Sequence, residues 1–575
     1  MTEQGSKTST PQWSYTSGTS DTPLLGLTIG DMFDATAATY PDQPALISRH
    51  QNIRLTYREL QAQVNQCARA LLHLGITKGQ RVGIWSPNRA EWCITQFATS
   101  KLGAILVNIN PSYRLHEVEY VLNQSGCSAI VIAAAFKSSS YTEMIAELAP
   151  ELARSEVGKL KAERLPNLTT VIRMGEDRVP GMLPWTELMA MGEQVSEQEL
   201  QRVQREQEFD DAINIQYTSG TTGFPKGATL SHHNILNNGY FVARLQNFTH
   251  EDKLCIPVPL YHCFGMVMGN LGCITHGATM VYPAEGFEPK ATLAAVQEER
   301  CTSLYGVPTM FIAELAHPDF ASYDFSSLRT GLMAGSPCPV EVMKRVNTEM
   351  HMPEMEIAYG MTETSPVSTQ TRVDSPLDKR VGTVGRIGPH LEIKVVDPAS
   401  GQVVPIGQPG ELCTRGYSVM LGYWNNPEAT ASAIDAARWM HTGDLATMDE
   451  EGYLNIVGRI KDMIIRGGEN VYPREIEEFL YTHPRISDVQ IIGVPDAKYG
   501  EEIMAWVQLR PGEQCTTEEI RAFCQGKIAH YKIPRYVKFV ESFPMTVTGK
   551  IQKFLMRKSA IEELGLESAA SVETA

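Results

Sequence analysis

The segment TSGTTGFPKGA at residues 218–228 has the residue types of a phosphate-binding loop. Glycine lets backbone N–H groups converge on an anion, hydroxyl side chains add donors, and Lys226 adds a positive charge. The segment has almost nothing to bury, and it directly follows residues 213–217, which we predict to be a buried strand. We therefore expect a phosphate cradle here rather than a flexible surface loop.

The spacing of this segment excludes two common phosphate-binding patterns. The Walker pattern GxxxxGK[ST] needs a second glycine five residues after the first, whereas Pro225 stands five residues after Gly220. The pattern GxGxxG is missing from the segment as well. If this segment binds phosphate, it therefore does so with a sequence pattern other than these two.

Residues 217–227 resemble the phosphate-loop signature of the adenylate-forming enzymes, a family that includes acyl-CoA synthetases, nonribosomal peptide adenylation domains and firefly luciferases. Five further segments resemble motifs of this family in its order: YHCFGM (261–266), YGMTE (359–363), TGD (442–444), GRIKDMIIRGGENVYPREIE (458–477) and PMTVTGKIQK (544–553). The resemblance covers roughly residues 27–558. It implies that a carboxylate attacks the α-phosphate of ATP to give an acyl adenylate and pyrophosphate, after which a thiol takes the acyl group and releases AMP.

The resemblance assigns the phosphate and metal contacts. The residues expected to hold the leaving β- and γ-phosphates are Thr218, Ser219, Gly220, Thr221, Thr222, Gly223 and Lys226. Glu363 matches the family's Mg²⁺ carboxylate, and Thr218 is expected beside the same ion, because a hard cation needs few carboxylates besides phosphate oxygens. Thr362 matches a residue that contacts the α-phosphate.

The resemblance also assigns the adenosine contacts. Tyr359 would lie against adenine, with Gly335 and Ser336 as the opposite wall. Asp444 matches the carboxylate that accepts hydrogen bonds from both ribose hydroxyls, and Arg459 matches a second ribose contact.

Two half-reactions imply a moving domain. Lys550 resembles the lysine that bridges the carboxylate and the α-phosphate during adenylation, where a cation stabilises developing negative charge. Lys461 occupies the family's hinge position. Gly468 matches a glycine that lines the enzyme's tunnel for the pantetheine arm of CoA. On this resemblance the small domain rotates between the steps, so that Lys550 leaves the site as Gly468 enters it.

The residues that follow Tyr261 indicate which class of carboxylic acid is the substrate. His262 matches a gate residue beside the acyl carbon, where amino-acid-activating relatives carry a nearby aspartate, and residues 263–268 carry no charge. A buried ammonium group would therefore lack a counter-ion, which is costly. We expect the wall of an alkyl pocket to include Phe264, Gly265, Met266, Met268, Gly269, Gly331, Met333 and Ala334.

These features predict a fatty acid–CoA ligase that uses ATP, Mg²⁺ and CoA and prefers a medium- to long-chain acid. Three alternatives stay open: an aryl-acid CoA ligase, a fatty acyl-AMP ligase that loads a carrier protein, and a noncatalytic nucleotide-binding protein.

The elements that must position these residues alternate between strands and helices. We predict strands at residues 81–85, 104–110 and 129–133, and helices at 89–102 and 116–124. Such alternation favours parallel sheets with flanking helices. Residues 137–208 are more charged and less periodic, and we expect surface helices and loops there. From residue 383 to 458, short strands between Pro and Gly turns indicate a barrel-like or meandering β region.

The predicted architecture is therefore α/β, with three parts. Residues 1–25 are expected to be a flexible polar tail, residues 26–458 a large domain of α/β subdomains plus a β-barrel-like subdomain, and residues 459–575 a small mobile α+β domain. The boundary and hinge are placed at 459–462, and Pro473 is expected to open a helix.

Composition limits the partners. The formal net charge of −16 disfavours nucleic-acid binding, although residues 527–558 carry a local surplus of +7 (eight Lys and Arg against one Glu) that could attract the phosphates of CoA. The 11 scattered cysteines indicate a reducing compartment, and the sequence has neither a signal-like start nor a membrane-spanning run. We expect a cytoplasmic enzyme of small-molecule substrates, with a homodimer and a peripheral membrane contact left open.

Overall fold

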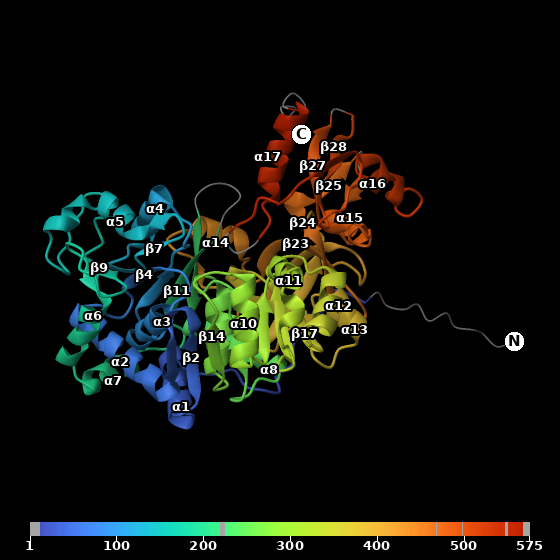
Figure 1. Ribbon diagram of the computed structural model, residues 1–575. Helices are drawn as coiled ribbons and strands as arrows, with labels where there is room; N and C mark the ends of the chain where they lie inside the picture. The colour runs from blue at the N-terminus through green and yellow to red at the C-terminus, as the bar shows by residue number, and fades with distance from the viewer. Residues whose placement is uncertain (1–11, 219–224, 467–468, 497, 547–549, 567–575) are drawn as a thin grey trace.

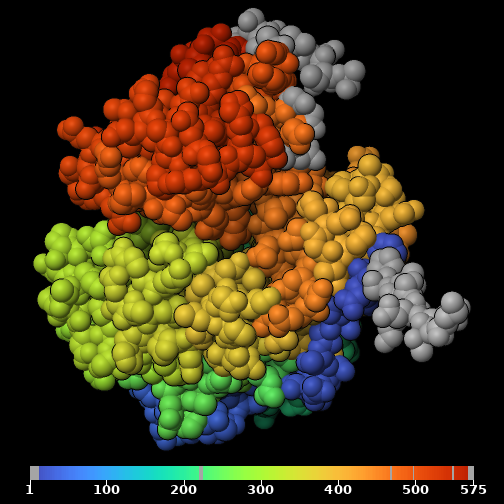
Figure 2. Space-filling model, turned by 90° about the vertical axis from the view of Figure 1, so that its right-hand side faces the viewer, coloured from blue at the N-terminus to red at the C-terminus, as the bar shows by residue number. Residues whose placement is uncertain are grey.

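The computed structural model describes residues 12–218, 225–466, 469–496, 498–546 and 550–566. Figure 1 shows two α/β halves side by side, one drawn in blue and teal and the other in green and yellow, with an orange-to-red C-terminal lobe above them. Figure 2 shows the same lobe stacked on the large body, with a groove between the two. The predicted order of an α/β body followed by a small lobe is therefore observed.

The first half is built on an eight-stranded sheet. Its strands, in spatial order, are β10 (Leu183–Pro184), β9 (Thr170–Arg173), β6 (Ala129–Ile132), β4 (Arg81–Trp85), β5 (Ile105–Asn108), β11 (Ala212–Thr218), β12 (Lys226–Ser231) and β22 (Gly422–Tyr423). The strands from β10 to β11 are parallel, whereas β12 and β22 join antiparallel. The strands predicted at 81–85, 104–110, 129–133 and 213–217 are thus confirmed as parallel neighbours. The expectation for 137–208 was incomplete, because β9 and β10 lie in that region and extend the sheet.

The second half is built on a nine-stranded mixed sheet. Its strands, in spatial order, are β19 (Arg386–Ile387), β18 (Val367–Gln370), β17 (Glu354–Gly360), β16 (Thr330–Ala334), β15 (Ser303–Gly306), β13 (Lys253–Cys255), β14 (Thr279–Tyr282), β2 (Pro44–Ser48) and β3 (Ile53–Thr56). The strands from β17 to β2 are parallel. Parallel strands end at the same edge, so β16 and β17 deliver the residues that follow them to one place.

Helices cover both sheets. Those of the large body are α1 (Ile29–Thr39), α2 (Tyr57–His73), α3 (Ala90–Leu102), α4 (Leu115–Ser125), α5 (Tyr141–Leu148), α6 (Trp185–Met191), α7 (Glu197–Arg205), α8 (His232–Leu245), α9 (Gly272–Ile274), α10 (Pro289–Glu299), α11 (Pro308–Leu315), α12 (Val340–Glu349), α13 (Leu377–Gly382) and α14 (Pro427–Ala433). The helices predicted at 89–102 and 116–124 are confirmed as α3 and α4. A π-helix at Phe264–Leu271 packs closely on α8, where a β-carbon on Gly239 would stand 2.9 Å from the Val267 carbonyl oxygen.

The β region after residue 383 is an antiparallel sheet. Its order is β1 (Tyr15–Ser17), β20 (Leu391–Val396), β21 (Gly410–Gly416), β23 (Met440–Met448) and β24 (Leu454–Arg459). In the described part of the chain β1 and β24 form its two edges, so the sheet is open. Of the two predicted forms, the meandering sheet is the one observed, and the barrel does not close.

Strand β1 also corrects the predicted tail for residues 12–25. The Tyr15 ring packs edge-on against Trp439 with centroids 6.5 Å apart, and its hydroxyl donates to Glu392 at 2.8 Å. The Tyr15 side chain and the backbone pairings of residues 13 and 15–17 therefore anchor a stretch whose Ser and Thr content suggested solvation.

The C-terminal lobe has its own sheet and cores. Its elements are β25 (Ile464–Arg466), β26 (Glu469–Val471), α15 (Pro473–Tyr481), β27 (Ile486–Asp496), β28 (Gly500–Leu509), α16 (Thr517–Cys524), β29 (Tyr536–Phe539) and α17 (Lys553–Leu564). Two hydrophobic clusters of this lobe contain buried residues from Ile464 to Ala560 only. A single 3₁₀ turn at Ile460–Asp462 connects the lobe to β24, at the predicted hinge. No helix in the described parts of the chain combines the length and apolar character that a bilayer span requires.

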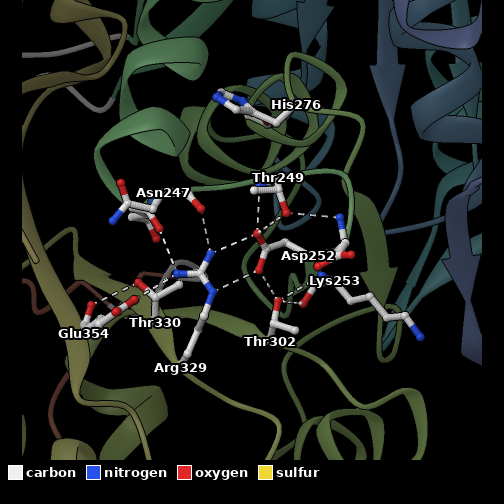
Figure 3. A network of polar contacts seen from close by, with 12 residues as sticks. Asn247, Thr249, Asp252, Lys253, His276, Thr302, Arg329, Thr330 and Glu354 are labelled. Atoms are coloured by element: carbon white, nitrogen blue, oxygen red, sulfur yellow. Dashed lines mark hydrogen bonds and ion pairs between the residues drawn. The ribbon is translucent and has the colours of Figure 1, made fainter. Parts of the chain in front are cut away.

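An ion-pair network around the buried Asp252 carboxylate ties the second half together. Arg329, at the start of β16, contacts Asp252 through two nitrogens at 2.9 and 3.2 Å and Glu354 at 2.9 Å (Figure 3). Its guanidinium also donates to the carbonyl groups of Gln246 and Asn247 at the end of α8. The Asp252 side chain is only 5% exposed, so this carboxylate depends on Arg329 for compensation.

We expect Arg329→Ala to destabilise the large body by about 3 kcal/mol, because it leaves the Asp252 carboxylate buried without its cation. The midpoint of urea unfolding followed by tryptophan fluorescence measures the effect. The matched control is Arg300→Ala, which removes an exposed ion pair with Asp324 and should cost less than about 1 kcal/mol. Equal shifts for both variants would contradict this account.

Candidate active site

The two strands that flank the glycine-rich loop meet the metal-type carboxylate. Strand β11 ends at Thr218 and β12 begins at Lys226, and these two residues are direct partners in the antiparallel register. The Thr218 hydroxyl donates to Glu363 Oε1 at 3.3 Å. The predicted residues Ser219, Gly220, Thr221, Thr222 and Gly223 lie outside the described residues.

Glu363 sits in a short 3₁₀ turn at Thr362–Thr364 that follows β17. The side chains of Thr362 and Glu363 are buried, at 7% and 5% exposure. Glu363 Oε1 also accepts a hydrogen bond from the Tyr423 hydroxyl at 2.8 Å, and burial together with this carboxylate raises the pKa of Tyr423. A buried carboxylate at the end of one sheet is thereby held by hydroxyl groups from the other.

Tyr423 is a residue that the sequence analysis missed. It lies on β22, which pairs with β12, and the Lys226 ammonium stands 5.3 Å from the centre of its ring. One side chain therefore contacts both the predicted phosphate lysine and the predicted metal carboxylate. Its signal in the sequence was a glycine-preceded tyrosine in a loop rich in turn residues.

The predicted ribose carboxylate is held from both sides. Tyr359, near the end of β17, donates its hydroxyl to Asp444 Oδ2 at 2.7 Å, and Arg459 Nε lies 3.1 Å from Asp444 Oδ1. Asp444 and Arg459 are register partners on β23 and β24. Burial and the Asp444 charge raise the pKa of Tyr359 well above its ordinary value, so Tyr359 is a neutral donor. Three of the five predicted adenosine contacts, Tyr359, Asp444 and Arg459, are thus brought together, and stacking of Tyr359 on adenine stays a prediction.

The irregular stretch of β23 that carries Asp444 depends on Gly443 and on a second missed residue, Glu411. Gly443 adopts a φ of +70°, a conformation that other residues rarely adopt. Its N–H donates to Glu411 Oε1 at 3.1 Å, and Thr442 donates its hydroxyl to the Leu412 carbonyl at 2.7 Å. Strand β21 therefore fixes the irregular stretch of β23 that presents Asp444.

Lys550 reaches from the C-terminal lobe into this constellation. Its Cε lies 4.0 Å from where a β-carbon on Gly335 would stand, and Gly335 follows β16 with a φ of +91°. Burial lowers the pKa of Lys550, and nearby Arg459 lowers it further, whereas the charges of Glu363 and Asp444 raise it. The Lys550 ammonium therefore lies near Gly335 and half-buried Ser336, the predicted adenine wall. The charges of Glu363 and Asp444 act on it there.

His262 is neutral in this setting. Burial and the Lys550 charge lower its pKa to about 3. Its Nδ1 accepts a hydrogen bond from the Phe264 N–H at 3.2 Å, which leaves the ring proton on Nε2. His262 stands directly before the π-helix, an element that recurs at functional sites.

The structure corrects the expected wall of the acyl pocket. Met333 packs in a core cluster with Met343 and Met350, whereas Ala334 belongs with Phe264 and Met266 to the other cluster. Successive residues of a strand point to opposite faces, so Gly331 and Met333 face away from the π-helix. The β-carbon positions of Gly265 and Gly269 are also taken, at 2.5 Å from the Pro259 carbonyl oxygen and 3.0 Å from Ile256.

The basic surplus at 527–558 is largely neutralised. Five of its cations pair with acidic residues outside the segment: Lys532 with Glu475, Arg535 with Asp496, Lys538 with Glu563, Lys553 with Glu477 and Arg557 with Glu501. The attraction for CoA phosphates is therefore weaker than the formal count indicated. Lys461 lies in the turn between the lobes as predicted for the hinge, and Gly468 lies outside the described residues.

Known proteins resemble the chain along nearly its whole length. A protein from Bacillus subtilis (strain 168) named putative acyl-CoA synthetase YngI is 50% identical over 95% of this chain and 99% of its own. The medium-chain acyl-CoA ligase ACSF2, mitochondrial, of Danio rerio is 48% identical over 96% of this chain and 91% of its own. The crystal structure of the anthranilate CoA ligase AuaEII in complex with anthranoyl-AMP matches with a TM-score of 0.83 at 26% identity, over 95% and 99% of the two chains.

Two family models divide the chain as the two lobes do. The model described as AMP-binding enzyme matches residues 33–424, and the model of the AMP-binding enzyme C-terminal domain matches residues 475–550. Thr218, Tyr359 and Arg459, which contact Glu363 or Asp444, are among the residues assigned from the motifs of adenylate-forming enzymes, whereas Tyr423 is not. This chain belongs to the family of AMP-binding enzymes.

Proposed function

We propose that the chain is an ATP-dependent acyl-CoA synthetase. It converts a medium- to long-chain fatty acid to an acyl adenylate with release of pyrophosphate, and then transfers the acyl group to CoA with release of AMP. Relatives named acyl-CoA synthetase or medium-chain acyl-CoA ligase, at 45% to 50% identity, support this activity.

The observation that carries the proposal is the position of Lys550. Attack of a carboxylate oxygen on the α-phosphorus builds negative charge on the phosphoryl oxygens. A preorganised cation in a site of low dielectric stabilises such charge strongly. Lys550 lies beside Gly335 and His262, where the acyl carboxylate and the α-phosphate would meet. We infer that the C-terminal lobe stands in its adenylation position.

Asp444 can bind ribose while it keeps its present contacts. A carboxylate oxygen has two acceptor sites, and Tyr359 and Arg459 use one on each oxygen. These two residues therefore orient the carboxylate and leave a lone pair on each oxygen for a ribose hydroxyl.

The donor set around Glu363 fits Mg²⁺. Thr218 and Glu363 offer only oxygen atoms, which hard cations prefer. Mg²⁺ bound there would neutralise charge on the phosphates of ATP. Tyr423 acts as a positioning residue, because its hydrogen bond sets the direction of the Glu363 carboxylate.

A fatty acid suits the acyl side of the site better than an amino acid. His262 is neutral and residues 263–268 carry no charge, so an ammonium group would find no counter-ion there. Each further methylene that is buried contributes about 0.8 kcal/mol. The structural match to an anthranilate CoA ligase favours an aryl acid as the second candidate. AMP release measured over alkyl acids of increasing length and aryl acids, with CoA or with carrier protein, separates these activities.

The homodimer and the cytoplasmic location stay predictions. The animal relatives are named mitochondrial, which does not favour the cytoplasmic location.

Lys550→Ala should lower acyl-adenylate formation about 10²- to 10³-fold, because it removes one preorganised charge donor. ATP–pyrophosphate exchange measures this step. Thioester formation from supplied acyl adenylate should be largely kept, since Lys550 serves only the first step. Lys558→Ala, an exposed lysine on α17, is the control and should retain both activities. Equal losses of both half-reactions in Lys550→Ala would refute the division of labour.

The fall of the adenylation rate at high pH should reflect deprotonation of Lys550. Its pKa is lowered, and only the protonated form stabilises the phosphate, so kcat/KM for ATP should fall as pH rises through that lowered pKa. Lys550→Arg should shift this fall to higher pH, because the guanidinium group stays protonated. The pH profile of pyrophosphate exchange tests this, and a fall at unchanged pH in Lys550→Arg would assign it to another group.

Tyr423→Phe should weaken the response to Mg²⁺ while it keeps the ring beneath Lys226. Loss of a hydrogen bond to a charged group costs about 1.5–3 kcal/mol, so adenylation at limiting Mg²⁺ should fall roughly tenfold or more. The activity is titrated against Mg²⁺ at fixed ATP. Tyr453→Phe, which loses a hydrogen bond to Ser375 instead, is the matched control. Identical Mg²⁺ curves for wild type and Tyr423→Phe would remove Tyr423 from the positioning role.

A further inference from the structure

Three side chains of metal-binding types meet on the antiparallel sheet, apart from Glu363. Cys413 on β21 and His441 on β23 are direct register partners, so their side chains share one face of the sheet. Glu411 lies two residues before Cys413 and joins the same face. One ligand atom from each residue lies within 4.8 Å of the other two.

The spacing of these atoms is close to that of a tetrahedral site. His441 Nδ1 lies 3.5 Å from Cys413 Sγ and 2.9 Å from Glu411 Oε2. Metal–ligand bonds of about 2.0–2.3 Å imply ligand separations of roughly 3.3–3.7 Å in a tetrahedron. The Cys–His pair already has this separation, and the His–Glu pair would open by roughly half an ångström.

A neighbouring hydrogen bond orients one of the three groups, and a carboxylate lies near a second. Glu411 Oε1 is held by the Gly443 N–H, which leaves Oε2 for the cluster. His441 Nε2 lies 3.7 Å from Asp435 Oδ2, which is beyond hydrogen-bond distance but leaves a negative charge beside the ring. Lys394, the register partner of Cys413 on β20, is a nearby cation, and the charges of Glu411 and Asp435 outweigh it.

A cation can enter from one side. The His441 side chain is 33% exposed, whereas Cys413 is fully buried. Three protein ligands leave a fourth position for water, as in zinc sites that are not closed.

We propose that Glu411 Oε2, Cys413 Sγ and His441 Nδ1 form a binding site for Zn²⁺ or another soft divalent cation. Cys413 binds as the thiolate and releases its proton to solvent. The sulfur and nitrogen ligands distinguish this site from the all-oxygen site at Glu363, which suits Mg²⁺. Because Glu411 also accepts the Gly443 N–H, the ion lies beside the stretch of β23 that presents Asp444.

Absorption spectroscopy with Co²⁺ tests the proposal on the full-length protein. Wild-type protein should show a thiolate-to-cobalt charge-transfer band that saturates at one ion per chain and disappears when Zn²⁺ is added. Cys413→Ser should lose the band. Cys515→Ser is the matched control, because Cys515 is the one cysteine that is not buried, and it should keep the band.

His441→Asn provides an independent variant at a partly exposed position, and it should weaken Co²⁺ binding while circular dichroism stays native. A band that persists in Cys413→Ser, Co²⁺ affinity unchanged in His441→Asn, or no band in wild type at excess Co²⁺ would each overturn the site.

Discussion

One constraint organises this molecule: a single lysine of the C-terminal lobe must stand among buried carboxylates of the large body. Lys550 is held by two hydrogen bonds to Thr546, one from each backbone N–H. Burial penalises its charge, and Glu363 and Asp444 restore part of it. The two carboxylates therefore stabilise the Lys550 charge only in part, and further negative charge in the site would stabilise it more. ATP and the acid substrate bring that charge.

The large body serves this constraint by joining three sheets at one place. The ends of β11 and β17 bring Thr218 and Glu363 together, and strand β23 adds Asp444. Each carboxylate is held by a tyrosine hydroxyl from another strand, Tyr423 for Glu363 and Tyr359 for Asp444. Strands and the short 3₁₀ turn at Thr362–Thr364 thus fix the geometry within the large body, and the C-terminal lobe contributes Lys550.

Much of this arrangement could be predicted from the sequence, for different physical reasons. Strands such as Arg81–Trp85 were found because a buried parallel strand is a continuous apolar run, and Lys550 and Asp444 were found only through motif resemblance. Long-range contacts were not predictable: Tyr423 meets Glu363 across 60 positions, and strand β1 pairs with β20 near residue 393. The faces of Gly331 and Met333 were misjudged because composition does not show which side of a strand faces the site.

The most direct measurement of the central claim is a crystal structure with a non-hydrolysable acyl-adenylate mimic. The account predicts that Lys550 Nζ lies about 3 Å from an oxygen of the phosphate-like group, with both ribose hydroxyls on Asp444. A mimic bound with its ribose away from Asp444, or a Lys550 side chain that contacts no part of the ligand while the lobes keep the present arrangement, would contradict it.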